Sequence, residues 1–153
     1  MNPNRPTSRI ALITGATRGI GLETCRQLAE AGVHILLAGR QAAHAAEAAE
    51  RLRQDGLAVE PLALDVTRPE QIAASVDDIR SRFGRLDILV NNAGVLRDDV
   101  TLKPSEQTLD CWRETFDTNL FAVVEVTRAF LPLLRAAGNA RIVNVSSQLA
   151  SMA

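Results

Sequence analysis

The feature that most constrains the fold of this chain is a glycine-rich turn between two apolar segments. The turn spans residues 14–21, follows an apolar run at residues 9–13, and leads into a segment whose apolar residues recur at helical spacing. Gly15 would free the backbone for a tight turn, Gly19 would let a phosphate group approach without a Cβ in the way, and Gly21 would let the helix pack closely on the strand. An anion would then lie on the unpaired N–H groups at the helix N-terminus. A tight turn that binds nothing is the structural alternative.

The rest of the chain alternates short apolar runs with longer helical patterns. Four further runs are typical of buried strands and span residues 33–38, 57–64, 86–90 and 141–147. Helical patterns separate them and span residues 41–54, 67–84 and 108–137. This alternation predicts the α/β class, with a doubly wound parallel sheet covered by helices on both faces. Right-handed crossovers place the third and second strands on one side of the first and the fourth and fifth on the other, with a crevice over Gly15 and Gly94.

Local signals add detail to these elements. The sequence Thr67-Arg68-Pro69-Glu70 has the form of a capping box, with Thr67 as the N-cap. Pro61 is compatible with the third strand only if that strand lies near the sheet edge. Pro132 lies inside the last helical pattern and predicts a kink or a break there. Residues 95–107 are polar, contain a proline, and are expected to form a loop.

Composition excludes several classes of protein. The 153 residues are 46% hydrophobic, which is enough for one domain with a sizeable core, and 17 basic side chains nearly balance 18 acidic ones. This balance favours neither a nucleic acid nor an anionic membrane as a partner. No apolar run reaches membrane-spanning length, and the polar start, residues 1–8, is expected to be a flexible tail rather than a secretory signal.

The cysteines and histidines indicate a reducing compartment and no metal. Cys25 and Cys111 are far apart in the sequence, and neither belongs to a C-x-x-C motif. The histidines are not clustered, so no metal site is expected. We therefore expect reduced thiols and a cytoplasmic location.

Three motifs together resemble those of one enzyme family. The spacing Gly-x-x-x-Gly-x-Gly after Thr14 differs from the general dinucleotide fingerprint and resembles the cofactor turn of the short-chain dehydrogenase/reductase family. Asp65-Val66 follows the third strand, where the family's Asp hydrogen-bonds the adenine. Asn91-Asn92-Ala93-Gly94 follows the fourth, where this element supports the sheet and lines the cofactor ribose. The resemblance implies a Rossmann-type NAD(P)-binding domain over residues 9–153, with these cofactor-binding residues in the three motifs: Thr14, Gly15, Thr17, Arg18, Gly19, Ile20, Gly21, Asp65, Val66, Asn91, Ala93 and Gly94.

The end of the second strand bears on which cofactor is bound. An enzyme that prefers NAD usually has an acidic residue there, which accepts a hydrogen bond from the ribose 2′-hydroxyl, whereas a 2′-phosphate requires positive charge. Here the strand ends in Ala38-Gly39-Arg40, and Arg18 lies in the glycine turn. The planar guanidinium group suits phosphate. The pattern therefore favours NADP over NAD, with a solvated residue at the helix start as the alternative reading of Arg40.

The resemblance also assigns catalytic positions. In the family, a Ser after the fifth strand, then a Tyr and a Lys, polarise and protonate a carbonyl while the nicotinamide delivers hydride, and an Asn in the preceding helix holds a water of the proton relay. Ser147 matches that Ser, and Asn119 in Asp117-Thr118-Asn119-Leu120 matches that Asn. The chain has no tyrosine and ends at Ala153. We therefore expect a sheet truncated after the fifth strand and a chain that is inactive on its own.

The sequence analysis predicts an NADP-dependent oxidoreductase that transfers hydride between NADPH and a small-molecule carbonyl or alcohol, with a homo-oligomeric full-length parent. A non-catalytic nucleotide-binding or interaction module is the alternative, and a sugar-nucleotide epimerase fits the glycine spacing less well. The fifth strand is expected to form an unprotected edge, and Trp112 and Phe116 to be exposed unless something covers them.

Overall fold

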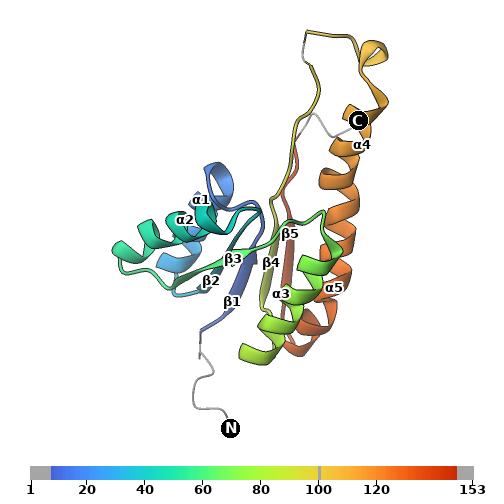
Figure 1. Ribbon diagram of the computed structural model, residues 1–153. Helices are drawn as coiled ribbons and strands as arrows, with labels where there is room; N and C mark the ends of the chain where they lie inside the picture. The colour runs from blue at the N-terminus through green and yellow to red at the C-terminus, as the bar shows by residue number, and fades with distance from the viewer. Residues whose placement is uncertain (1–7, 100, 148–153) are drawn as a thin grey trace.

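Five parallel strands form a single sheet in the computed structural model, which describes residues 8–99 and 101–147 (Figure 1). The strand order is β3-β2-β1-β4-β5, and every neighbouring pair is parallel. The strands are β1 (Ile10–Ile13), β2 (His34–Gly39), β3 (Val59–Ala63), β4 (Ile88–Asn91) and β5 (Arg141–Asn144). This order confirms the predicted topology, and β3 lies at an edge, where Pro61 is tolerated.

Helices cover both faces of the sheet (Figure 1). On one face lie α1 (Gly19–Glu30) and α2 (Ala42–Gln54), and on the other lie α3 (Pro69–Arg82) and α5 (Ala122–Ala136). Alternate residues of β1 point to opposite faces, so Ile10 and Leu12 pack in the core under α3 and α5, whereas Ala11 and Ile13 pack in the core under α1 and α2. All four are fully buried. The predicted doubly wound α/β class is therefore confirmed.

The order of the strands reverses at β1. This strand pairs with β2 on one side, through Leu12 and Leu36, and with β4 on the other, through Leu12 and Leu89. The connections after β1 and after β4 therefore leave the sheet in opposite directions. In open parallel sheets, ligands bind in the crevice that this divergence creates beyond the carboxyl ends of the strands.

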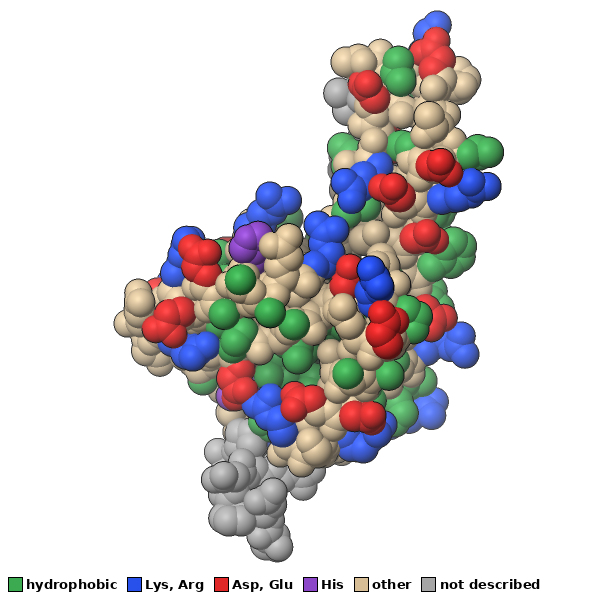
Figure 2. Space-filling view, in the orientation of Figure 1, with side chains coloured by type: hydrophobic (Ala, Val, Ile, Leu, Met, Phe, Trp, Pro, Cys, Tyr) green, Lys and Arg blue, Asp and Glu red, His purple; other side chains and the backbone are tan. Residues whose placement is uncertain are grey.

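A long helical column rises beyond the carboxyl ends of the strands, so that its upper part projects from the body of the molecule (Figures 1 and 2). It consists of α4 (Leu109–Phe116), a π-helical turn η2 (Asp117–Phe121) and α5, and a short 3₁₀ helix η1 (Pro104–Glu106) precedes it. The predicted start is correct, since the Thr108 hydroxyl caps α4 by accepting the amide of Cys111 at 3.2 Å. The polar loop predicted over residues 95–107 contains η1.

The column is not broken at Pro132, contrary to one of the two outcomes predicted for that residue. Pro132 lies inside α5 and has no N–H to donate to the carbonyl of Arg128, one turn earlier. Both residues are exposed. Water can therefore solvate the unpaired carbonyl, while Phe130, Leu133 and Leu134 bury the opposite side of the helix. The irregular turn lies at η2 instead.

The capping box predicted at Thr67 is wrong. The N-cap of α3 is Arg68, with Pro69 as the first helical residue, and no side chain caps this end. The Thr67 hydroxyl donates to Asp65 Oδ1 at 2.7 Å, and the Thr67 amide donates to the same oxygen at 3.0 Å. The nearer carboxylate outcompetes the backbone of the first helical turn for this hydroxyl.

Strand β5 is an open edge, as predicted. All four of its residues are exposed, and the apolar side chains of Ile142 and Val143 are 43% and 47% exposed. Trp112 and Phe116 on α4 are also exposed. An apolar surface therefore extends over α4 and β5 among the described residues.

Three further sequence expectations concern surface charge, membrane spans and the N-terminal tail. Acidic and basic side chains are interspersed over the face in Figure 2, in keeping with the near-neutral charge. Within residues 8–99 and 101–147, no helix combines the length and the apolar character needed to span a bilayer. Of the predicted N-terminal tail, residues 1–7 lie outside the described residues, and the Ser8 carbonyl accepts a hydrogen bond from Arg85 Nη2 at 3.2 Å.

Candidate functional site

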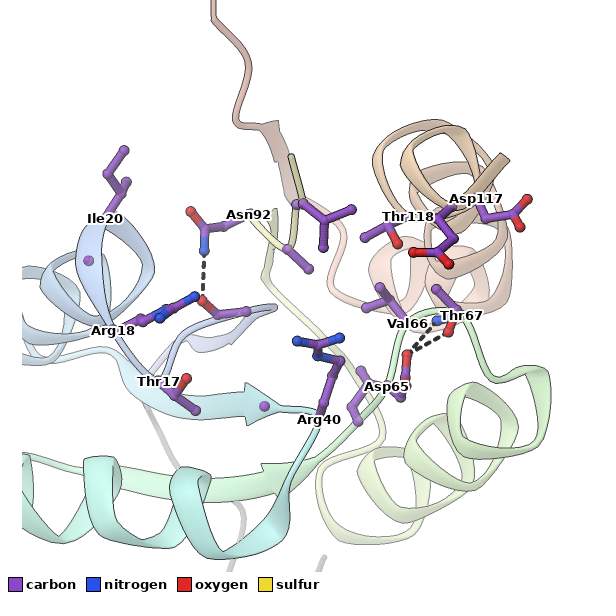
Figure 3. Close-up of a pocket in the computed structure, with 18 of the residues that line it drawn as sticks. Thr17, Arg18, Ile20, Arg40, Asp65, Val66, Thr67, Asn92, Asp117 and Thr118 are labelled. Atoms are coloured by element: carbon purple, nitrogen blue, oxygen red, sulfur yellow. Dashed lines mark hydrogen bonds between the residues drawn. The ribbon is translucent and has the colours of Figure 1, made fainter. Parts of the chain in front are cut away.

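A cleft of about 630 Å³ lies over the carboxyl ends of β1, β2 and β4, where the strand order reverses (Figure 3). Most of the predicted cofactor-binding residues line it: Gly15, Thr17, Arg18, Gly19, Ile20, Arg40, Asp65, Val66, Ala93 and Gly94. The predicted residues Thr14, Gly21 and Asn91 lie behind this lining. The cleft therefore brings together residues from all three sequence motifs.

The glycine turn has the backbone geometry that its sequence predicts. Gly15 and Gly19 have φ angles of 61° and 58°, in the left-handed region that favours glycine. A Cβ built on Gly15 would lie 2.7 Å from the Cα of Ala93, whereas one built on Gly19 would have no heavy atom within 4 Å. Gly15 is therefore required by its neighbour, and Gly19 faces open space in the cleft.

The first turn of α1 leaves donors available to a ligand. The Ala16 amide donates to the Ala38 carbonyl at 2.8 Å, and the Leu22 amide donates to the Arg18 carbonyl at 3.4 Å. The amides of residues 17–21 have no such acceptor among the residues that the structure describes. Arg18 is the N-cap residue of α1, and its side chain makes no capping hydrogen bond. Unpaired amides at a helix N-terminus form an anion site, which the helix dipole strengthens.

A partly buried network of hydrogen bonds ties the glycine turn to the Asn-Asn-Ala-Gly element. The Thr14 hydroxyl oxygen accepts the amides of Asn92 and Ala93, at 3.1 and 3.0 Å. In return, Asn92 Nδ2 donates to the carbonyls of Thr14 and Gly15, each at 3.0 Å. Gly21 allows this approach, because its Cβ would lie 2.4 Å from Asn92 Nδ2. Thr14 and Gly21 therefore support the cleft without lining it.

The sequence analysis assigns Asn91 to the cofactor site, but the structure places Asn91 behind the cleft and Asn92 in its lining. The Asn91 side chain is buried, and its Nδ2 donates to Asn144 Oδ1 at 2.8 Å and to Thr127 Oγ1 at 3.1 Å, which ties β4 to β5 and α5. Asn92 lines the cleft instead. Successive residues at a strand end point to opposite sides, so the register of β4 decides which asparagine faces the cleft.

Positive charge gathers at the end of the cleft next to β2. Arg40 follows β2 directly, and its side chain extends into the space between the glycine turn and the Asp65 loop (Figure 3). Neither Arg18 nor Arg40 has a carboxylate within 4 Å among the described residues, whereas most other arginines there form ion pairs. Two guanidinium groups without protein partners are therefore available to an anion.

Acidic and polar residues form the opposite wall. The Asp65 amide donates to Gln71 Oε1 at 2.8 Å, and Asp65 Oδ1 accepts both hydrogen bonds from Thr67 (Figure 3). This Asx turn fixes Asp65 and the buried Val66 at the edge of the cleft. From the helical column, Asp117 and Thr118 face the same space.

The outer part of the cleft contains residues that the sequence analysis does not single out. Arg97 and Glu114 line it and form an ion pair, with Arg97 Nε 3.1 Å from Glu114 Oε2. No periodicity or motif in residues 95–107 indicates this pair, because the loop brings it together only through its tertiary path.

Of the two predicted catalytic residues, Asn119 is held rigidly. It lies in η2, where its Oδ1 accepts the Val95 amide at 2.8 Å and its Nδ2 donates to the Val95 carbonyl at 2.7 Å. Ser147 is exposed and follows the end of β5. Neither residue is part of the lining of the cleft, although Asn119 Oδ1 lies 3.4 Å from the position of a Cβ built on Gly94.

Neither cysteine has the features of a reactive thiol. Cys25 is fully buried, which raises the pKa of its thiol to about 12. Desolvation and the carboxylate of Asp98 also raise the pKa of Cys111. Within the described part of the chain, no three His, Cys, Asp or Glu side chains are grouped so as to hold a metal ion.

The chain is similar in sequence to the short-chain dehydrogenases. The family model described as short chain dehydrogenase matches residues 9–153. Short-chain dehydrogenase/reductase 1 of Saponaria officinalis is 40% identical to this chain over an alignment of 161 residues, gaps included. The alignment covers 92% of this chain and 53% of that protein. The chain therefore spans about half the length of the curated relatives it matches.

Solved structures share the fold at similar levels of identity. A gluconate 5-dehydrogenase from Burkholderia cenocepacia, in complex with NADP and tartrate, has a TM-score of 0.86 and 38% identity over 97% of this chain and 57% of its own. An actinorhodin polyketide ketoreductase variant with NADPH has a TM-score of 0.83 and 34% identity over 92% of this chain and 53% of its own.

Proposed function

The chain belongs to the short-chain dehydrogenase family, and from this premise we propose that it binds NADP in the cleft of an oxidoreductase that transfers hydride between NADPH and a carbonyl or alcohol. The observation that carries the proposal is a set of amides at residues 17–21 beside Arg18 and Arg40. Among the residues that the structure describes, these amides have no acceptor and the two arginines have no ion pair. NADP has anionic groups suited to both features, a pyrophosphate and a 2′-phosphate.

The pyrophosphate would bind over the glycine turn. Gly19 leaves open space where a side chain would stand, and the amides of residues 17–21 at the N-terminal end of α1 have no acceptor among the described residues. The helix dipole and the hydrogen bonds favour the same site. Hydrogen bonds between Thr14 and Asn92 hold the turn in this conformation.

The adenosine would extend toward the end of β2 and the Asp65 loop. Arg18 and Arg40 would bind the 2′-phosphate, since no acidic side chain follows β2 to accept from a free 2′-hydroxyl. Asp65 and Val66 would bind the adenine. Two of the neighbouring structures are complexes with NADP or NADPH, which supports NADP as the cofactor.

For the reaction, bound NADPH would supply the hydride. Ser147 would hold the substrate oxygen with its hydroxyl, and Asn119 would hold a water of the proton relay while it fixes the loop at Val95. The chain contains no tyrosine to donate the proton. We therefore expect cofactor binding by the 153-residue chain, without turnover of a carbonyl substrate.

The remaining expectations accompany this function. We propose a small-molecule substrate, a homo-oligomeric full-length protein and a cytoplasmic location. Support for the last comes from Cys25 and Cys111, which are both free thiols.

Titration of the chain with NADPH and NADH, followed by intrinsic fluorescence or calorimetry, tests the cofactor assignment. We expect tighter binding of NADPH, and we expect Arg40→Ala to remove most of that preference, about 10-fold or more, because a charge-assisted hydrogen bond is lost. Arg53→Ala is the matched control, since Arg53 is paired with Glu50 on α2 and does not line the cleft. Unchanged discrimination in Arg40→Ala would contradict the proposal.

A further inference from the structure

A second hollow adjoins the cleft at the start of α2. Its volume is about 450 Å³, and Thr17, Arg18 and Arg40 line both spaces. Its other lining residues are Gln41, His44, Glu47, Ala48 and Arg51. A group bound between Arg18 and Arg40 would therefore face two different environments, the main cleft on one side and the first turns of α2 on the other.

The charges in this hollow favour an anion. Glu47 is its only carboxylate, and it is paired with Arg51, with Arg51 Nη2 2.5 Å from Glu47 Oε1. Because Glu47 is paired with Arg51, it does not compensate the charges of Arg18 and Arg40. No described carboxylate lies within 4 Å of either guanidinium group. No described residue bonds the imidazole of His44, which shares the hollow with them.

The backbone at the start of α2 adds to this effect. The first intrahelical bond runs from the Ala45 amide to the Gln41 carbonyl at 3.1 Å, and the Gln41 side chain does not cap the helix. The amides of residues 42–44 therefore have no acceptor among the described residues, and the first turn has no acidic residue. His44 belongs to this turn, so its ring lies at the positive end of the dipole of a 13-residue helix.

We infer that His44 is a specificity-determining residue, which binds the 2′-phosphate of the adenosine ribose together with Arg18 and Arg40. The inference rests on the proposed function, since it assumes that the nucleotide lies in the adjoining cleft. Arg51 is not expected to contribute in the same way, because its charge is already compensated by Glu47. Imidazole N–H donors bind phosphate oxygens through charge-assisted hydrogen bonds.

The test compares two probes that differ only in the 2′-phosphate, 2′,5′-ADP and 5′-ADP, by isothermal titration calorimetry on the chain. We expect wild type to prefer 2′,5′-ADP, and His44→Ala to lower that affinity about 10-fold while the affinity for 5′-ADP stays within about twofold. His44→Arg should keep the preference at the wild-type level or above it. Arg53→Ala, on the same helix but outside the hollow, should change neither affinity.

The outcomes separate the inference from the proposed function. If wild type binds both probes but His44→Ala keeps the wild-type preference, or loses both affinities equally, the role of His44 is overturned and the cofactor site stands. A loss of preference in Arg53→Ala or His44→Arg as large as in His44→Ala would also overturn it. If wild type binds neither probe, the proposed function and the inference fail together. The alanine variant is expected to fold, since His44 is exposed and alanine favours the helix.

Discussion

At the level of single residues, Gly15 and Gly19 have nearly the same backbone conformation but different surroundings. Each has a positive φ, so an alanine at either position would be strained by about 1 kcal/mol. At Gly15 the added Cβ would also collide with the Ala93 backbone at 2.7 Å, whereas at Gly19 it would enter the space left for the ligand. Gly15 is therefore required by the fold, whereas Gly19 is required only by the proposed binding of the pyrophosphate.

A pair of alanine substitutions checks this division. Gly15→Ala is expected to destabilise the chain by about 2–4 kcal/mol, because strain and the collision with Ala93 add. Gly19→Ala should cost only about 1 kcal/mol and yet weaken NADPH binding at least 10-fold. Urea unfolding and NADPH titration on both variants measure the two effects. Equal loss of stability in the two variants would refute the distinction.

At the scale of elements, the hydroxyl of Thr14 joins the turn after β1 to the turn after β4. It accepts two backbone amides, those of Asn92 and Ala93, from a segment far away in the sequence. Thr14 is 1% exposed, so water cannot replace the lost acceptor. The two turns that carry the binding motifs are therefore held as one unit.

Thr14→Val keeps the shape of the side chain and removes that acceptor. We expect it to lower the free energy of unfolding by about 2–3 kcal/mol, because two partly buried amides lose their acceptor. Thr24→Val is the matched control, since the exposed Thr24 hydroxyl only donates to the Ile20 carbonyl of its own helix at 2.8 Å. Chemical denaturation compares the two, and a Thr14 variant no less stable than the control would contradict the role of the network.

The helices and strands of this chain can be predicted from the sequence pattern, but several contacts between them cannot. The alternation of apolar runs and helical patterns predicts the strands and helices, because strand length and helix period are local properties. The right-handed crossover rule then predicts the strand order and the position of the cleft. Three features depend on tertiary geometry and are missed or misassigned: the choice of Asn92 over Asn91 at the cleft, the continuation of α5 through Pro132, and the use of the Thr67 hydroxyl by Asp65. The capping-box pattern of Thr67 and Glu70 does not take account of Asp65, whose carboxylate two residues upstream competes for the Thr67 hydroxyl.

For the molecule as a whole, the features that determine stability differ from those that determine solubility. The two cores are closed under their helices, whereas the β5 edge and the α4 surface present apolar groups to solvent. An edge strand with unpaired backbone groups and exposed β-branched side chains is a template for association with other chains. The chain can thus be well folded and still self-associate.

Val143→Lys tests this view. A charge at the centre of β5 is expected to reduce light scattering of a concentrated solution several-fold and to leave the melting temperature within about 2 °C, since Val143 is 47% exposed. Leu96→Lys is the control, because Leu96 is exposed in the loop after β4 and does not belong to β5. Scattering that falls equally in both variants would show that added charge, and not the edge, sets solubility.

The hydrogen bonds between Thr14 and Asn92 have a further consequence for how the protein acquires its site. Residues 78 positions apart must meet before the glycine turn gains its supports, so no short peptide carrying residues 9–31 would reproduce the binding surface. Contacts of such long sequence separation form slowly and late during folding. Nucleotide affinity would therefore rise in step with the last stage of assembly, which makes a bound nucleotide a reporter of completed folding.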